Sequence, residues 1–214
     1  MKRLTTILAL GCIIAMSLTS CLKNDDNDES NGLTPAQITQ CFNALRGEYS
    51  GQMIYPVYMQ SVNDYDTDTV DIDFTVATDT TLTIHELPAK VVAGTVNDED
   101  LRTAMVEQNP INRVKCLMGF YNLNTFVEFY LGPQKVDYPI FYKNQTRTLS
   151  VYFWVNTTSF GFKELTSGLV AGQIVMGAIY LDNDNSKNYL LTGSTPSVPL
   201  IFATDISKAT SATK

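Results

Sequence analysis

Hydrophobic and polar residues alternate with a period of two along most of the chain after residue 48. In residues 70–76, four branched or aromatic apolar residues alternate with Asp and Thr, and the pattern resumes in residues 81–85 after a short turn. A period of two places the apolar side chains on one face of a strand, so this pattern predicts half-buried β-strands. Further strands are expected at about 49–59, 112–121, 124–131, 136–142, 147–156, 172–181, 188–192 and 197–203.

An amphipathic helix is expected at the start of the globular region. Thr34 can cap its N-terminus, Pro35 suits the first helical position, and Gln37 completes a Thr-x-x-Gln capping box. A second, shorter helix is expected at about 98–108, with Asn97 as its cap and acidic residues in its first turn. One face of the first helix carries its apolar residues, which are Ile38, Cys41, Phe42 and Leu45.

Short strands separated by turn-sized gaps are typical of antiparallel all-β architectures. We therefore expect a mostly β (α+β) fold, either an antiparallel β-sandwich or an open barrel, with one N-terminal helix and one short helix. The expected strand at 172–181 is apolar on both faces from Ile174 to Leu181. It is therefore expected to be a central strand that is covered on both sides.

The first twenty residues have the parts of a secretory signal. A basic pair, Lys2 and Arg3, is followed by an apolar stretch at residues 4–16. That stretch is shorter than the roughly 20 residues that a transmembrane helix needs. The signal ends in Leu18-Thr19-Ser20-Cys21, which resembles the lipobox of bacterial lipoproteins. This resemblance implies cleavage before Cys21 and lipidation of its thiol, and more than one acyl chain would anchor the protein stably on a membrane.

The chain divides into four expected parts. Residues 1–20 form the signal peptide, and residues 21–33 form an acidic, polar tether that cannot bury enough apolar surface to fold. Residues 34–204 are long enough for a single β-rich domain with its own core. Residues 205–214 form a C-terminal tail.

Charge excludes one class of partner. The chain has 15 basic and 22 acidic residues, a net charge of −7, and loss of Lys2 and Arg3 with the signal peptide makes this −9. An acidic protein is poorly suited to bind nucleic-acid phosphates, so no nucleic-acid partner is expected. Acidity also opposes charge-driven docking on anionic headgroups, which leaves the lipid on Cys21 as the expected link to the membrane.

Two cysteines remain in the expected domain, because Cys12 leaves with the signal peptide and Cys21 takes lipid. Cys41 lies on the apolar face of the first expected helix, and Cys116 lies on the apolar face of an expected strand. Two buried free thiols are one interpretation, since free cysteines are usually buried. A disulfide between them is the alternative in an exported protein, and it would contribute about 4 kcal/mol by the loop-entropy estimate.

Candidate catalytic and metal-binding residues are few. The single histidine, His85, lies on the polar face of its expected strand, and no nucleophile or carboxylate near it in sequence completes a catalytic arrangement. The acidic segments 64–68 and 182–186 begin like calcium loops but lack the turn glycine and the bidentate glutamate. They are more simply interpreted as polar turns. We therefore expect no catalytic residue, no metal and no cofactor.

The aromatic residues give the one indication of binding. In the expected strand 147–156, Tyr152 and the only tryptophan, Trp154, lie opposite the strand's aliphatic face. Such a face could stack on sugar rings, or it could be buried by the first helix or by a second sheet. Neighbouring expected strands repeat the pattern with Phe126, Tyr130, Tyr138 and Tyr142.

Four features together suggest a family. They are the lipobox, the acidic tether, the Leu45–Gly51 segment with its Gly-x-Tyr-x-Gly start of a strand, and the run from Leu87 to Leu101. In these features the chain resembles the small lipoproteins of unknown function that are common in gut Bacteroides and their relatives. The acidic run after Cys21 also resembles the surface-export signal of such lipoproteins. The resemblance implies the outer membrane, with the cell surface favoured over the periplasmic face, and it brings no activity with it.

The sequence thus predicts a lipid-anchored envelope or cell-surface lipoprotein without enzymatic activity. A binding or accessory module for a glycan or a peptide is the first expectation, with Tyr152 and Trp154 as the ligand platform. A structural or assembly component of the outer-membrane envelope is the alternative, because no cluster of polar residues marks a site.

Overall fold

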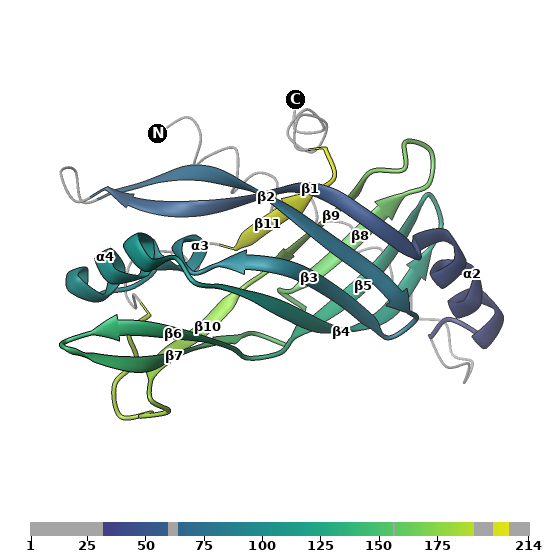
Figure 1. Cartoon of the computed structure of the whole chain (residues 1–214). Coiled ribbons are helices and arrows are strands. Elements are labelled where there is room, and N and C mark those ends of the chain that lie inside the picture. Colours follow the sequence, from purple (N-terminus) through teal and green to yellow (C-terminus); the bar gives the residue numbers. More distant parts are fainter. Residues whose placement is uncertain (1–31, 60–63, 156, 191–198, 206–214) are drawn as a thin grey trace.

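A computed structural model describes residues 32–59, 64–155, 157–190 and 199–205 of the chain (Figure 1). The expected signal peptide, Cys21, most of the tether and residues 206–214 lie outside the described residues. The helices are α2 (Pro35–Leu45), α3 (Lys90–Ala93) and α4 (Glu99–Gln108). The strands are β1 (Gly47–Met59), β2 (Asp64–Thr78), β3 (Thr81–Pro88), β4 (Ile111–Leu123), β5 (Phe126–Pro133), β6 (Val136–Tyr142), β7 (Gln145–Phe153), β8 (Phe160–Glu164), β9 (Val170–Ile174), β10 (Met176–Leu181) and β11 (Leu200–Ala203).

Eight antiparallel strands form a closed barrel in the order β1-β11-β9-β8-β5-β4-β3-β2. The remaining strands form a three-stranded sheet in the order β10-β7-β6. The predicted mostly β fold with an N-terminal helix and a second short helix is confirmed. Of the two predicted architectures the barrel is the one formed, and it closes because β1 pairs with both β2 and β11.

The barrel interior is filled by side chains from the inward-facing positions of its strands. Phe74, Phe129 and Phe202 are fully buried, and the rings of Phe74 and Phe202 meet edge to face with their centroids 5.3 Å apart. The predicted alternation produces this core, since every second residue of a strand points inward. Buried side chains of the described strands therefore pack inside the barrel as its core.

Helix α2 lies against one end of the barrel (Figure 1). The predicted capping box is present: the Thr34 side chain accepts the Gln37 backbone N–H, and the Gln37 side chain accepts the Thr34 backbone N–H. Leu45 and Cys41 of α2 are fully buried in the barrel core. Lys163 Nζ of β8 donates to the Ala44 carbonyl at 2.7 Å, which satisfies one of the unpaired carbonyls at the helix C-terminus.

The three-stranded sheet continues three neighbouring barrel strands. Barrel strands β9, β8 and β5 are neighbours in this order. Short segments of the chain join them to β10, β7 and β6 respectively, which are neighbours in the same order. Two backbone hydrogen bonds cross this junction, from Trp154 N to Val175 O and from Leu131 N to Ser159 O, each 2.8 Å long. One wall of the barrel thus bends away at this junction and extends beyond the barrel (Figure 1).

Helices α3 and α4 lie between the extended wall and the β1–β2 hairpin (Figure 1). The inner face of the three-stranded sheet packs towards them, and Tyr138 donates from its hydroxyl to the Leu87 carbonyl at 2.9 Å. Asp98 caps α4 by accepting the Leu101 N–H at 3.0 Å, so the expectation that Asn97 is the cap is wrong by one residue. The buried residues of the inner face are Val136, Tyr138, Ile140, Tyr142, Leu149, Val151, Phe153, Ile179 and Leu181.

Each edge of the three-stranded sheet is covered at one point by side-chain or main-chain groups from another segment. At the β6 edge, the Gln108 side-chain amide donates to the Phe141 carbonyl at 2.8 Å and accepts the Phe141 N–H at 2.7 Å. At the β10 edge, Ile179 bonds to the Asn188 side chain and to the Tyr189 N–H. Covered edges do not offer the free backbone groups that a further strand would pair with.

The expected central strand at 172–181 is wrong in two respects. The segment breaks at Val175 into β9 and β10, which belong to different sheets. Strand β10 is at a sheet edge, and its outward residues Gly177, Ala178 and Tyr180 are only half-buried. The hydrophobic pattern could not show the break, because both pieces have a buried side.

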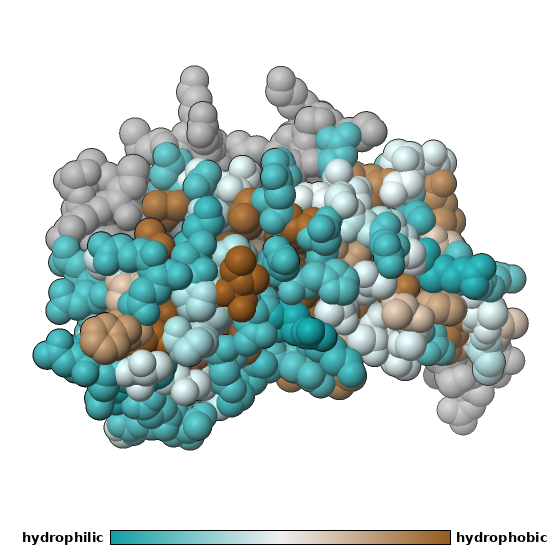
Figure 2. Space-filling model, viewed as in Figure 1, coloured by the Kyte–Doolittle hydropathy of each residue, from teal (hydrophilic) through white to brown (hydrophobic). Residues whose placement is uncertain are grey.

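The surface seen in Figure 2 is mostly hydrophilic, and its hydrophobic residues form small, separate groups. Within the described ranges, none of the helices has the length and apolar character needed to span a bilayer.

Candidate functional site

The outer face of the three-stranded sheet carries the best candidate site. Tyr152 of β7 and Tyr180 of β10 lie diagonally across neighbouring strands, because Tyr180 pairs with Ser150 and Ala178 pairs with Tyr152. Their rings meet edge to face with centroids 5.6 Å apart. The predicted placement of Tyr152 opposite the aliphatic face of its strand is confirmed, while its partner Tyr180 was not predicted.

Trp154 is displayed on a rigid support. The alternation of β7 places the indole on the side of Tyr152, and the residue is 52% exposed. The ring lies over Gly177 of β10, where a Cβ would come within 3.4 Å of the indole. The Trp154 N–H donates to the Val175 carbonyl, and the Trp154 carbonyl accepts the Ser159 hydroxyl at 2.8 Å. The main chain is therefore held by two hydrogen bonds although the residue is half exposed.

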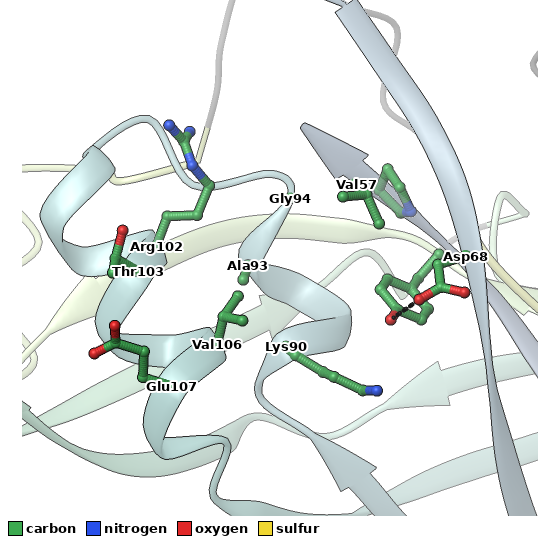
Figure 3. A pocket seen from close by; sticks show the side chains of 11 residues that line it. Val57, Asp68, Lys90, Ala93, Gly94, Arg102, Thr103, Val106 and Glu107 are labelled. Carbon is green, nitrogen blue, oxygen red and sulfur yellow. Dashed lines mark hydrogen bonds between the residues drawn. The ribbon is translucent and has the colours of Figure 1, made fainter. Parts of the chain in front are cut away.

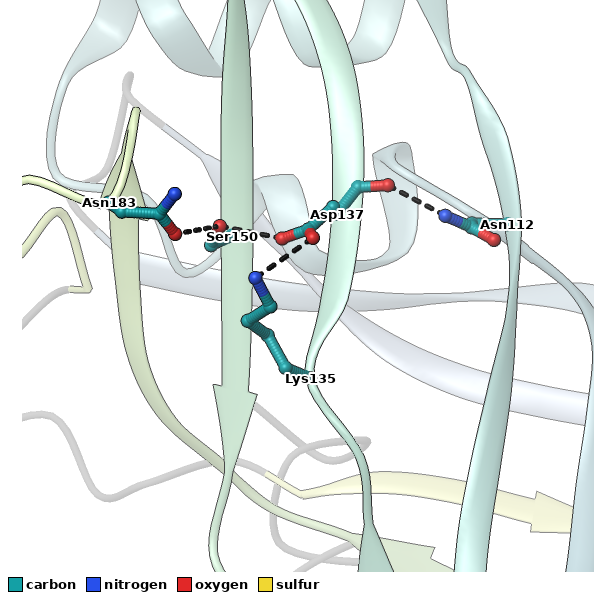
Figure 4. A network of polar contacts seen from close by, with 5 residues as sticks. All are labelled: Asn112, Lys135, Asp137, Ser150 and Asn183. Carbon is teal, nitrogen blue, oxygen red and sulfur yellow. Dashed lines mark hydrogen bonds and ion pairs between the residues drawn. The ribbon is translucent and has the colours of Figure 1, made fainter.

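A polar network lies on the same sheet as the aromatic rings, and Figure 4 shows its residues. Asp137 of β6 accepts the Ser150 hydroxyl at 2.6 Å and pairs with Lys135 Nζ at 2.9 Å. Asn183 Oδ1 lies 3.4 Å from Ser150 Oγ, and the Asn112 amide donates to the Asp137 backbone carbonyl. Asp137, Ser150 and Asn183 thus form a row across β6, β7 and the turn after β10 (Figure 4).

Lys135 joins the polar network to the aromatic rings. Its Nζ lies 5.9 Å from the centroid of the Tyr152 ring while it pairs with Asp137. Burial raises the pKa of Asp137, but the hydrogen bonds from Ser150 and Lys135 outweigh it and hold this pKa below its ordinary value. The bond to Asp137 raises the pKa of Lys135. Both side chains are therefore charged at neutral pH.

Four aromatic residues that the sequence grouped with this face lie elsewhere. Tyr138 and Tyr142 are on the inner face of the sheet and are buried, so their expected membership of the same aromatic display is wrong. Phe126 and Tyr130 lie on the outside of the barrel, where Tyr130 stacks on Tyr121 with centroids 4.2 Å apart. Alternation showed which residues share a face of one strand but not which face is covered.

Cys41 and Cys116 are both free thiols and both fully buried. Burial raises the pKa of Cys116 to about 12 and also raises that of Cys41, which keeps both thiols protonated and unreactive. Of the two interpretations left open by the sequence, the structure has the buried free thiols. Cys21 lies outside the described residues.

His85 is exposed, and its Nε2 lies 2.6 Å from the Thr75 hydroxyl. Asp68 and Asp182, from the two acidic segments, are bonded to Tyr55 and Arg147 respectively. In the described part of the chain, no group of three His, Cys, Asp or Glu residues could hold a metal ion.

A hollow of about 580 Å³ lies between β1, α3 and α4 and is a second candidate site. Val57 and Val106 face it from opposite walls (Figure 3). The Tyr55 hydroxyl donates to Asp68 at 2.9 Å; burial and this carboxylate raise the pKa of Tyr55 to about 12. The Thr69 N–H and the Tyr55 hydroxyl lower the pKa of Asp68. Because these polar groups satisfy each other, the hollow is the weaker candidate.

The comparisons with known proteins give a family and no activity. Residues 44–181 match the model of the family described as Domain of unknown function (DUF4840). The match extends from the end of α2 to the end of β10 and includes the aromatic residues, Lys135, Asp137 and Ser150. No curated protein and no solved structure matches the chain. Because the match covers more than half of the sequence, the chain belongs to the DUF4840 family.

Proposed function

We propose that this member of the DUF4840 family is a lipid-anchored lipoprotein of the outer membrane that binds carbohydrate at the cell surface. The anchor would be the acylated Cys21, and the binding surface would be the part of the outer face that carries Trp154, Tyr152 and Asp137, away from the β6–β7 hairpin. The resemblance of the lipobox and acidic tether to those of Bacteroides-type surface lipoproteins supports the location.

One observation carries the binding proposal. The indole of Trp154 is half exposed although its main chain is fixed on both sides and Gly177 supports the ring. An exposed ring that is already ordered loses little conformational entropy when a ligand stacks on it. Apolar C–H faces of sugars stack on aromatic rings, and carboxylates such as Asp137 accept sugar hydroxyls.

A peptide that adds a strand to the sheet is the less favoured ligand. The Gln108 side chain occupies the backbone groups of Phe141 at one edge, and Asn188 with Tyr189 covers the other edge. Strand addition requires free backbone donors and acceptors along such an edge. These hydrogen bonds support the outer face, and not an edge, as the proposed binding surface.

The binding proposal is tested with the mature lipoprotein in a detergent that has no sugar headgroup. Polysaccharides and a glycan array are screened with the parent, with Trp154→Ala and with Phe141→Ala. Phe141 is a matched control, because it is an aromatic residue of the same sheet that is 56% exposed but lies at the far hairpin. We expect the parent and Phe141→Ala to bind the same glycans and Trp154→Ala to lose them. An array without hits, or hits that persist in Trp154→Ala, would refute the proposal.

The anchor is tested separately by fractionation of cells. The parent is expected in the outer-membrane fraction and accessible to protease on intact cells, with a fatty modification in its intact mass. A Cys21→Ser variant is expected to leave the membrane fraction. If the variant sediments with the envelope as the parent does, the lipid anchor is wrong. Crosslinking of the parent to one abundant envelope protein, independent of Trp154, would instead support the structural or assembly role.

A further inference from the structure

We infer that the ligand of this face is an uncharged oligosaccharide that contacts Trp154 with one sugar ring and Asp137 with the hydroxyls of another. This inference rests on the proposed carbohydrate function and adds the class of carbohydrate. It follows from the separation of the two contact points, from the free acceptor sites of Asp137 and from the pairing of the charges.

The two contact points are too far apart for a single sugar ring. Ser150 is paired with Asp137 across β7 and β6, and Trp154 lies four residues further along the chain. At about 3.3 Å per residue of extended chain, the separation along the strand is about 13 Å. Tyr152 lies between these points, with Lys135 beside it. A ligand that uses both ends must therefore be a chain of rings.

Asp137 retains hydrogen-bonding capacity for a ligand. Its Oδ1 accepts the Ser150 hydroxyl and its Oδ2 accepts Lys135, while its side chain is 43% exposed. An ionised carboxylate has about four acceptor sites, so these two donors do not exhaust it. Ser150 is fully buried, and its one hydroxyl hydrogen is donated to Asp137. Ser150 therefore orients the Asp137 carboxylate but does not contact the ligand itself. The remaining acceptor sites suit donors such as a pair of sugar hydroxyls.

Charge pairing favours an uncharged ligand. Lys135 is paired with Asp137 at 2.9 Å, and Arg147 is paired with Asp182 at 2.7 Å. A uronate or a sugar phosphate would have to compete with these carboxylates for the cations. The net charge, −7 for the full chain and −9 after loss of Lys2 and Arg3, adds a general repulsion of anionic polymers. A neutral sugar does not need Lys135 or Arg147, and its hydroxyls can donate to the ionised carboxylate of Asp137.

The inference is tested by isothermal titration of the mature lipoprotein, with Trp154 fluorescence as a second readout. The probes are cellohexaose, xylohexaose and mannohexaose, the corresponding monosaccharides, and oligogalacturonate as the acidic counterpart. We expect at least one neutral hexasaccharide to bind about tenfold or more tightly than its monosaccharide and than oligogalacturonate, a difference of about 1.4 kcal/mol. Asp137→Asn, which keeps the shape of the side chain, is expected to weaken this binding about tenfold, while Phe141→Ala binds as the parent does.

Failure of this inference is distinguishable from failure of the proposed function. If a hexasaccharide binds through Trp154 but its monosaccharide binds equally well, or Asp137→Asn binds normally, carbohydrate binding stands and the two-point oligosaccharide is wrong. If oligogalacturonate binds more tightly than the neutral hexasaccharides, the claim that the ligand is uncharged is wrong, whereas the claim of two contact points stands. No binding of any neutral hexasaccharide also overturns the inference, and the glycan array then decides the proposed function. The unfolding midpoint of Asp137→Asn verifies that the variant is folded.

Discussion

Gly161 in the barrel wall and Gly177 in the three-stranded sheet each lie beneath an aromatic ring, but the two rings have opposite environments. A Cβ at Gly161 would come within 2.6 Å of the Phe129 ring, which is fully buried in the barrel core. A Cβ at Gly177 would come within 3.4 Å of the Trp154 indole, which is half exposed. The glycine in the barrel makes room for tight packing, whereas the glycine in the sheet supports a ring that solvent can reach.

The comparison shows that exposure and rigidity are separate properties. Phe129 is fixed because it is enclosed, and its removal would leave a cavity. Trp154 is fixed by its backbone bonds to Val175 and Ser159 although its ring is not enclosed. The Trp154 ring is ordered without being part of the core, which is the property that stacking on a ligand requires.

The largest expected difference is in stability between Phe129→Ala and Trp154→Ala. The first variant should lower the free energy of unfolding by about 3–5 kcal/mol, because it empties part of the barrel core. The second should lower it by less than about 1 kcal/mol, because the ring is half exposed. Denaturant unfolding followed by circular dichroism measures both. If both variants lose the same free energy of unfolding, Trp154 is a core residue, and the contrast between Trp154 and Phe129 does not hold.

The two glycines are tested by adding side chains beneath the rings. Gly161→Ala should cost about 1–3 kcal/mol, since the methyl group would clash with Phe129. Gly177→Ala should cost less, because its methyl group meets the indole near ordinary contact distance. Gly177→Val should displace the indole, with a red shift and stronger iodide quenching of Trp154 fluorescence. If Gly177→Val leaves both unchanged, Gly177 does not position the ring.

The support of Trp154 is tested at Ser159, which is fully buried. Its hydroxyl donates to the Trp154 carbonyl and accepts the Val175 N–H at 3.2 Å. Ser159→Ala leaves both groups without this partner and should cost about 1–2 kcal/mol. Iodide quenching of Trp154 should also increase, because the loop becomes less ordered. If stability falls but iodide quenching is unchanged, Ser159 stabilises the junction between the two sheets and does not hold Trp154 in its exposed position.

The smallest expected effect is a pH dependence that comes from Asp137. Its pKa is lower in the folded protein than in an unfolded chain, so it contributes stability above the ordinary carboxyl pKa. That contribution is lost as the pH falls through the folded-state pKa. Because the group is half exposed, the effect should be less than about 1 kcal/mol. The free energies of unfolding of the parent and Asp137→Asn should therefore differ at pH 7 and converge as the pH falls through the lowered pKa of Asp137; a constant difference would contradict this assignment.

Much of the secondary structure follows from local signals. The capping box at Thr34 and the alternation at residues 70–76 predict α2 and β2, because caps and strand faces depend on neighbouring residues. The placement of Tyr152 and Trp154 opposite an aliphatic face was predictable for the same reason. The lipobox before Cys21 is likewise a local motif, and its role remains a prediction.

The sequence by itself determined most of the strands, the first helix, which side chains share a face of a strand, and the acidic charge. Only the tertiary structure decided that the barrel closes, that the chain bends at Val175 and that Tyr180 joins Tyr152. It also decided that Tyr138 is buried, that Cys41 and Cys116 remain apart as free thiols, and that Asp137 lies beside Ser150. The physical reason is that a strand's pattern fixes which side chains share a face, whereas the cover of that face depends on pairing between distant segments.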